Sequence, residues 1–169
     1  MRSLRSAIFL SLAGVVLAIA GYALAQQGGR DYPIVGTWVL NLEESSFVEG
    51  GPNYPPPRQQ TEIYELLDSE FMQLTISRLT ADGSSTTNKL MWPASGGVLR
   101  REKGTAPADE MIIETRIAPG DWFVTYMDAG AQYMTMHKVV STDGQKMRQT
   151  LTTYVDGERR EAVQVFDRE

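Results

Sequence analysis

The chain has 169 residues, the size of one ordinary domain. It contains no cysteine and one histidine, which excludes disulfide bridges, thiolate metal sites and zinc sites built on several imidazoles. With 42% hydrophobic and 22% charged residues it can bury a core. Its formal net charge of -5 disfavours nucleic acid as a partner, because acidic surfaces repel phosphates.

Residues 1–25 have the pattern of a secretory signal peptide. Arg2 and Arg5 precede an apolar run over 7–25, and Ala23-Leu24-Ala25 forms a small-x-small cleavage site. We therefore predict cleavage after Ala25 and a periplasmic or secreted protein. The apolar run also reaches the lower limit of a membrane span. A retained membrane anchor is the alternative.

After a flexible lead over 26–33, residues 34–169 are predicted to form one domain of short strands. Ten segments alternate apolar or β-branched residues with polar ones, which is the pattern of half-buried strands. They are 34–41, 60–67, 71–80, 84–92, 98–103, 110–117, 121–127, 132–140, 146–155 and 159–167.

The breaks between these segments carry turn residues. Asp82-Gly83, Pro119-Gly120, Asp143-Gly144 and Asp156-Gly157 supply the positive φ that tight hairpins need. The stretch 42–59 contains four prolines, so we expect a loop there. Hairpins without crossover helices predict an all-β antiparallel meander. Such a sheet can remove its exposed edges by closing on itself, so we predict a single up-and-down barrel of eight to ten strands.

Alternation also predicts which side chains face the interior. The predicted inward rows are Met72, Leu74 and Ile76; Met111, Ile113 and Ile117; Trp122, Val124 and Tyr126; and Met147, Gln149, Leu151, Thr153 and Val155. The opposite rows, with Glu114 and Arg116, are expected to face solvent. On 132–140 the row of Met134 and Met136 and the row of Tyr133 and His137 fit the interior equally well.

The first strand resembles a known group of proteins. Gly36-Thr37-Trp38-Val39-Leu40-Asn41 followed by Ser45-Ser46-Phe47 is similar to the G-T-W-x-L-N opening of small exported bacterial proteins with a lipocalin-like barrel, mostly of unassigned function. The resemblance continues through the turns at 80–83 and 139–144 and the closing strand 163–167.

The resemblance implies a calycin-type barrel that binds a small apolar molecule. It also implies structural roles for Gly36 and Trp38. In lipocalins the tryptophan of the first strand plugs the closed end of the barrel under an arginine near the last strand. Arg159, Arg160 and Arg168 all fit that arginine.

Few residues suit catalysis. His137 is the only imidazole, and with Glu114 it is the candidate for proton transfer; the alternative is an ordinary strand residue. The sequence contains no G-x-S-x-G elbow, Walker A pattern, dinucleotide glycine motif or calcium loop. A haem site with His137 as the axial ligand is conceivable in a β-barrel, but a single histidine on a strand is weak evidence for it. We predict no metal and no cofactor.

Two main functions remain open. The first is a barrel that binds a small hydrophobic ligand, with a wall of aromatic and aliphatic side chains. The predicted wall residues are Trp122, Tyr126, Trp92, Met111, Ile113, Met147 and Leu151. The second is a cofactor-independent isomerase, cyclase or hydratase in the same cavity; a structural or protein-interaction role is a further alternative. An ionisable inward residue with a hydrogen-bonded partner would favour the enzyme.

Overall fold

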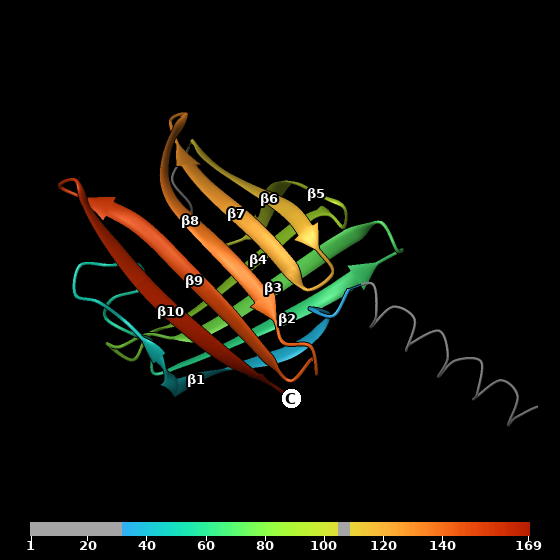
Figure 1. Cartoon of the computed structure of the whole chain (residues 1–169), viewed down its shortest axis with the longest axis horizontal. Helices are drawn as coiled ribbons and strands as arrows, with labels where there is room; N and C mark the ends of the chain where they lie inside the picture. Colours follow the sequence, from blue (N-terminus) through green and yellow to red (C-terminus); the bar gives the residue numbers. More distant parts are fainter. Residues whose placement is uncertain (1–31, 105–108) are drawn as a thin grey trace, which may run out of the picture. The chain divides into compact units, whose positions relative to one another are not determined.

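The computed structural model describes residues 32–104 and 109–169, and these contain ten β-strands (Figure 1). The strands are β1 (Gly36–Ser46), β2 (Gln59–Leu67), β3 (Phe71–Leu79), β4 (Ser85–Pro93), β5 (Gly96–Lys103), β6 (Glu110–Ala118), β7 (Asp121–Asp128), β8 (Ala131–Val140), β9 (Lys146–Val155) and β10 (Glu158–Arg168). Each matches a predicted segment. The largest difference is at β1, which runs on to Ser46 into the predicted proline-rich loop. The predicted signal peptide and nearly all of the predicted lead lie outside the described residues.

Each strand pairs antiparallel with the next one along the chain, and β1 also pairs with β10. The sheet is therefore a closed barrel in which every strand has two neighbours. This confirms the predicted all-β, single antiparallel up-and-down barrel. Closure gives the polar backbone groups of both terminal strands a partner, which an open sheet would leave exposed.

The hairpins depend on residues with positive φ. In the turn between β9 and β10, Asp156 has φ 53° and Gly157 has φ 80°. The turn between β7 and β8 has the same pair of conformations at Ala129 and Gly130. Two positive φ values in a row follow the right-handed twist of the flanking strands, so short loops are sufficient here.

One end of the barrel is closed by Trp38. Its side chain is 0% exposed, and its Nε1 donates a hydrogen bond to the Ile34 carbonyl at 2.7 Å. The arginine above its ring is Arg168, whose Cζ lies 4.3 Å from the ring centroid. Gly36 has φ +137°, and a Cβ there would lie 2.6 Å from Arg168 Nη1. A glycine is therefore needed beside this stacked pair.

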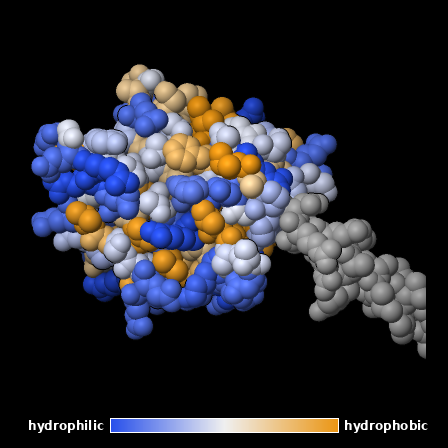
Figure 2. Space-filling model, viewed as in Figure 1, coloured by the Kyte–Doolittle hydropathy of each residue, from blue (hydrophilic) through white to orange (hydrophobic). Residues whose placement is uncertain are grey.

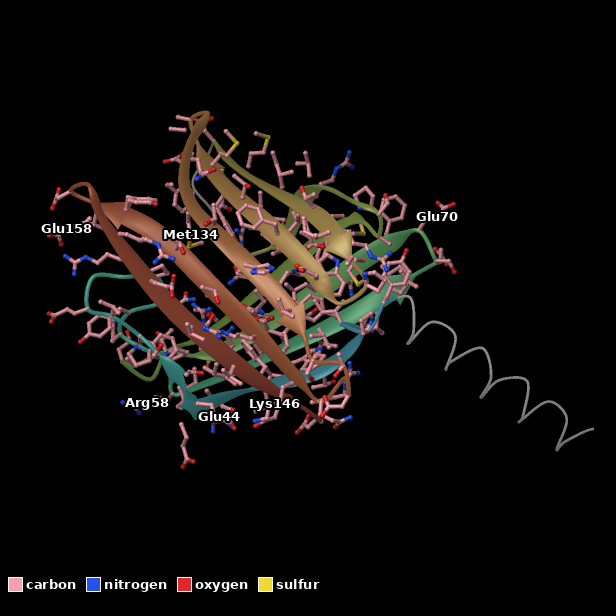
Figure 3. The ribbon with its side chains drawn as sticks, in the orientation of Figure 1. Glu44, Arg58, Glu70, Met134, Lys146 and Glu158 are labelled. Atoms are coloured by element: carbon pink, nitrogen blue, oxygen red, sulfur yellow. The ribbon has the colours of Figure 1, made fainter. Side chains whose placement is uncertain are left out.

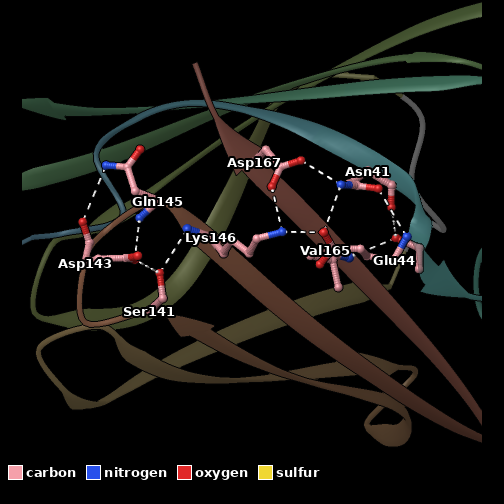
Figure 4. A network of polar contacts seen from close by, with 9 residues as sticks. Asn41, Glu44, Ser141, Asp143, Gln145, Lys146, Val165 and Asp167 are labelled. Atoms are coloured by element: carbon pink, nitrogen blue, oxygen red, sulfur yellow. Dashed lines mark hydrogen bonds and ion pairs between the residues drawn. The ribbon is translucent and has the colours of Figure 1, made fainter.

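A network of polar side chains joins β1, β9 and β10 on the outside of the barrel (Figure 4). Asn41 Nδ2 donates to Asp167 Oδ2 at 2.7 Å. Lys146 forms ion pairs with Glu44 and, at 3.2 Å, with Asp167. Exposed ion pairs contribute little stability, so this network mainly fixes the register along the seam between the two terminal strands.

The outer face of the barrel mixes charged and apolar side chains. Figure 2 shows one side of it, on which small apolar groups lie among charged ones. Arg58, Glu70 and Glu158 project outward (Figure 3) and are exposed. Within the described residues, no helix is long and apolar enough to span a membrane.

Candidate functional site

A cavity of about 620 Å³ lies inside the barrel, at the end opposite Trp38. Asn53, Thr80 and Gly104, which follow or precede strands, line its outer part. Its wall combines apolar side chains with many polar ones. The apolar part comprises Ile76, Met134, Met136 and Leu151, with Tyr126; the polar part includes Gln60, Glu62, Arg78, Asn88, Gln149 and Gln164.

Glu62 is the centre of a buried hydrogen-bond network. It is 3% exposed. Its Oε1 accepts from Gln60 Nε2 at 2.8 Å, and its Oε2 accepts from the Tyr64 hydroxyl at 2.9 Å and from Gln149 Nε2 at 2.7 Å. Three donors compensate the cost of removing this carboxylate from water.

Arg78 lies next to this network and has no acidic partner. Its Nε donates to Gln60 Oε1 at 2.8 Å and its Nη1 to Asn53 Oδ1 at 3.2 Å. None of the ion pairs among the described residues includes Arg78. Burial lowers its pKa from the usual range, against an opposing effect of Glu62. The cavity wall therefore carries a cation bound only to neutral oxygens.

A second polar chain reaches the cavity from Asn53. Asn53 Nδ2 donates to Gln164 Oε1 at 3.2 Å. Gln164 is 1% exposed, and its Nε2 has no hydrogen-bond partner among the described residues. A buried amide donor without a partner is costly, which marks a place where a bound acceptor would be stabilised.

An ion pair spans the mouth of the cavity. Arg101 Nη2 lies 2.5 Å from Glu110 Oε2, and Arg101 Nη1 donates to Asn88 Oδ1 at 3.0 Å. The Tyr133 hydroxyl donates to Glu110 Oε1 at 2.9 Å. Burial and this hydrogen bond raise the pKa of Tyr133 to about 12.

Tyr133 reaches this position because β8 is irregular. Tyr126 pairs with Met134 and Met127 with Gln132, so Tyr133 is an extra residue on β8. Such a bulge turns neighbouring side chains to the same side, and both Tyr133 and Met134 line the cavity. Both rows that the sequence allowed for this strand therefore contribute to the wall.

Tyr126 lies on the cavity wall next to Tyr133, and it is close enough to Glu62 to feel the charge of that carboxylate. Its ring centroid is 6.1 Å from that of Tyr133, and its hydroxyl has no hydrogen-bond partner among the described residues. Burial, then the charge of Glu62, raises its pKa, so the hydroxyl stays protonated. It is a neutral donor available to a ligand.

Toward the closed end, Glu114 and Lys138 form a buried ion pair. Lys138 Nζ lies 2.5 Å from Glu114 Oε2, and Trp92 Nε1 donates to Glu114 Oε1 at 2.6 Å. Both charged residues are less than 5% exposed. A small cavity of about 30 Å³ adjoins them.

Five of the seven predicted wall residues lie in the barrel interior, in three groups. Tyr126 and Leu151 line the 620 Å³ cavity. Trp92 lines the small cavity near Lys138. Trp122 and Met147 are at most 2% exposed and line neither cavity, so they pack the barrel interior away from the site.

The inward row predicted for β6 is wrong. Met111 is 37% exposed, and Ile113 pairs with Val98 and Thr125 on the outer face. Ile112 and Glu114, both 4% exposed, face the interior instead. Glu114 was expected on the solvent face; inside the barrel its partners Lys138 and Trp92, from other strands, offset part of the cost of removing its charge from water.

His137 lies outside the barrel. Its side chain is 48% exposed, and its Nε2 lies 2.7 Å from Asp121 Oδ1. Neither interior cavity contacts it. The structure therefore does not bring His137 and Glu114 together as a proton-transfer pair. The described residues contain no cluster of acidic or histidine side chains suited to a metal ion.

Gln60, Glu62, Arg78, Arg101, Glu110 and Gln164 were not predicted as site residues. The sequence does carry a signal for some of them. Gln164 lies between the apolar Ala162 and Phe166 in one row of β10, and Gln149 lies between Met147 and Leu151 in one row of β9. A polar residue in an otherwise apolar inward row indicates a polar interior.

Comparison with known proteins shows the fold. No family model and no curated protein matches the chain. Among solved structures, the wild-type fluorescent protein UnaG is 18% identical, with a TM-score of 0.58 over 80% of this chain and 96% of that one. Zebrafish ileal bile acid-binding protein, complexed with cholic acid, is 11% identical, with a TM-score of 0.51 over 81% and 99%. The chain has the closed calycin-type barrel of these proteins.

Proposed function

We propose that the barrel binds a small amphipathic molecule in the 620 Å³ cavity, with an anionic group at Arg78. The observation that carries this proposal is a partly buried guanidinium whose hydrogen-bond partners are all neutral. An incoming carboxylate would supply the missing charge through charge-assisted hydrogen bonds. The similar fold of a protein complexed with cholic acid supports a small-molecule role.

The rest of the wall suits an apolar body. Ile76, Met134, Met136 and Leu151 offer aliphatic and thioether surface, and methionine adapts to ligands of varied shape. The sequence alone predicted a small hydrophobic ligand. The polar groups around Arg78 and the free hydroxyl of Tyr126 make an amphipathic one the better match, because an apolar molecule would leave them without partners.

The test is a titration with dansylaminoundecanoic acid and with its methyl ester, followed by probe fluorescence and by quenching of tryptophan. The acid should bind saturably and more tightly than the ester. Arg78→Met should weaken binding of the acid about 10- to 100-fold, the value of a charge-assisted hydrogen bond, and remove the preference for it. Arg58→Met, which removes the same charge from an exposed position, is the matched control.

Absence of saturable binding for both forms would refute the proposal and leave a structural or protein-interaction role. Equal loss for the acid and the ester in Arg78→Met would show that the arginine holds the wall together and does not recognise the anion.

We also propose that the barrel acts outside the cytoplasm, after cleavage following Ala25. The support is the charged start, apolar run and Ala23-Leu24-Ala25 site of the sequence. N-terminal sequencing of protein recovered from the periplasm or the medium should begin at Gln26. An intact Met1 in a membrane fraction that resists a carbonate wash would show a retained anchor.

A catalytic role is the second candidate, and Glu62 favours it. An ionisable inward residue with hydrogen-bonded partners is the feature expected of an enzyme. However, three donors already occupy the Glu62 oxygens. Exchange of the α-protons of a long-chain methyl ketone in deuterated water, followed by NMR, tests this role. Exchange that the protein accelerates and Glu62→Gln abolishes would establish it.

A further inference from the structure

We infer that the closed-end compartment takes an aldehyde group and that Lys138 binds it covalently as an imine, with Glu114 as its proton acceptor and counter-ion. This inference rests on the proposed function, since the aldehyde must enter through the 620 Å³ cavity. It concerns a different part of the interior from Arg78.

Lys138 is buried, unlike Lys146. Its side chain is 4% exposed, whereas that of Lys146 is 47% exposed. Its Nζ lies 5.3 Å from the centroid of the Tyr64 ring and 5.6 Å from that of Trp92. These aromatic faces stabilise a cation at this point, whether an ammonium or a protonated imine.

The nitrogen lies in a compartment next to the larger cavity. The two cavities share Glu62, Ile76, Tyr126, Met136 and Gln149 as wall residues, so they adjoin each other. The smaller one, of about 30 Å³, is bounded by Lys138, Glu114 and Trp92. That volume is about the space one water molecule takes in the liquid, which is comparable with a terminal aldehyde group.

The chemistry needs no further reagent. Glu114 Oε2, 2.5 Å from Nζ, takes one proton from the ammonium and frees the nitrogen lone pair. The amine adds to the carbonyl carbon to give a carbinolamine. The carbonyl oxygen leaves as water when the C=N bond forms, and the proton from Glu114 returns to leave an iminium ion. The carboxylate, held by Trp92 Nε1, is then its counter-ion.

Stability alone does not account for this pair. Burying two charges carries a large desolvation cost, and packed apolar residues often stabilise a core as well or better. Here the pair borders a cavity, where its lysine can react with what the cavity holds. A buried lysine suits Schiff-base chemistry because burial favours the neutral amine, and the neighbouring carboxylate can accept the proton that the amine gives up.

The experiment uses the full chain with dodecanal, followed by reduction with cyanoborohydride and peptide mass spectrometry. We expect one dominant adduct, on Lys138. Lys138→Arg keeps a cation beside Glu114 but cannot form an imine, so the adduct should be lost. The matched variant Lys146→Arg, at an exposed lysine, should retain it. Dodecanol, which has no carbonyl group, should displace the dansyl probe from all three proteins.

Two results would overturn the inference, and they are distinguishable. If dodecanol displaces the probe but dodecanal labels only exposed lysines, and Lys138→Arg changes nothing, imine formation is refuted while ligand binding stands. If neither the dansyl probe nor dodecanol binds, the proposed function fails and the inference fails with it.

Discussion

Trp38 shows how much one side chain contributes to this barrel. It is fully buried, its indole nitrogen donates a hydrogen bond to the Ile34 carbonyl, and the Arg168 guanidinium covers its ring. We predict that Trp38→Ala lowers the free energy of unfolding by about 3–5 kcal/mol, through lost burial and the cavity left behind. Urea denaturation measures this loss.

Tyr154→Ala is the control for that measurement, because Tyr154 is 64% exposed and should change stability by about 0.5 kcal/mol or less. Equal effects of the two substitutions would contradict the role of Trp38 as the plug of the closed end.

The phenol of Tyr133 is predicted to weaken the fold at alkaline pH. Its pKa in the barrel is raised to about 12, whereas an unfolded tyrosine titrates near 10. The folded state therefore keeps this proton after the unfolded state has lost it. Its contribution to stability is complete below about pH 10 and disappears as the pH rises to about 12.

The measurement is the free energy of unfolding in urea across that pH range. Tyr133→Phe should give a shallower decline than the parent protein. Tyr64 and Tyr126, whose pKa values are also raised by burial, act in the same direction and should leave part of the decline in place. Identical slopes for the variant and the parent would refute the prediction.

The inward residues explain why the site was harder to predict than the strands. Strand positions follow from local alternation and turn residues, which each segment carries by itself. The partners of Glu62 come from β2 and β9, and those of Glu114 from β4 and β8. The sequence of a single strand does not show that its polar residue will find such partners. Glu114 was therefore expected to face solvent, although it lies in the polar interior.

The β6 strand gives the sharpest case of this difficulty. Both of its rows contain apolar residues, Met111 and Ile113 on one side and Ile112 on the other. A one-residue shift exchanges the two faces completely. In contrast, most of the inward residues predicted on β3, β7 and β9 are correct: Met72 and Leu74, Trp122 and Val124, and Met147 and Leu151 are buried, whereas Val155 at the end of β9 is 39% exposed.

The orientation of β6 makes a testable difference between neighbours. Met111→Lys should change the free energy of unfolding by about 0.5 kcal/mol or less, because the side chain is on the outer face. Ile112→Lys should cost about 3 kcal/mol or more, because it replaces a buried aliphatic side chain with a charge. Thermal unfolding followed by circular dichroism compares them. The reverse order would restore the register predicted from the sequence.

The barrel as a whole should gain stability when its cavity is filled. A ligand that binds only the folded state adds about 2.7 kcal/mol at one hundred times its dissociation constant. We therefore expect dansylaminoundecanoic acid to raise the melting temperature in proportion to the logarithm of its concentration. Arg78→Met should need proportionately more probe for the same rise. An unchanged melting temperature at saturation would indicate binding outside the folded barrel.

The pairing of β1 with β10 sets the order in which the barrel is completed. β1 pairs with β2 only from Gly36 to Val39, and its remaining pairs are with the last strand. Every other ladder joins neighbours in the sequence, most of them through short turns, whereas the final ladder must bring together distant parts of the chain. Until β10 pairs with β1 the sheet is open, so Arg168 reaches Trp38 only in the step that closes the barrel.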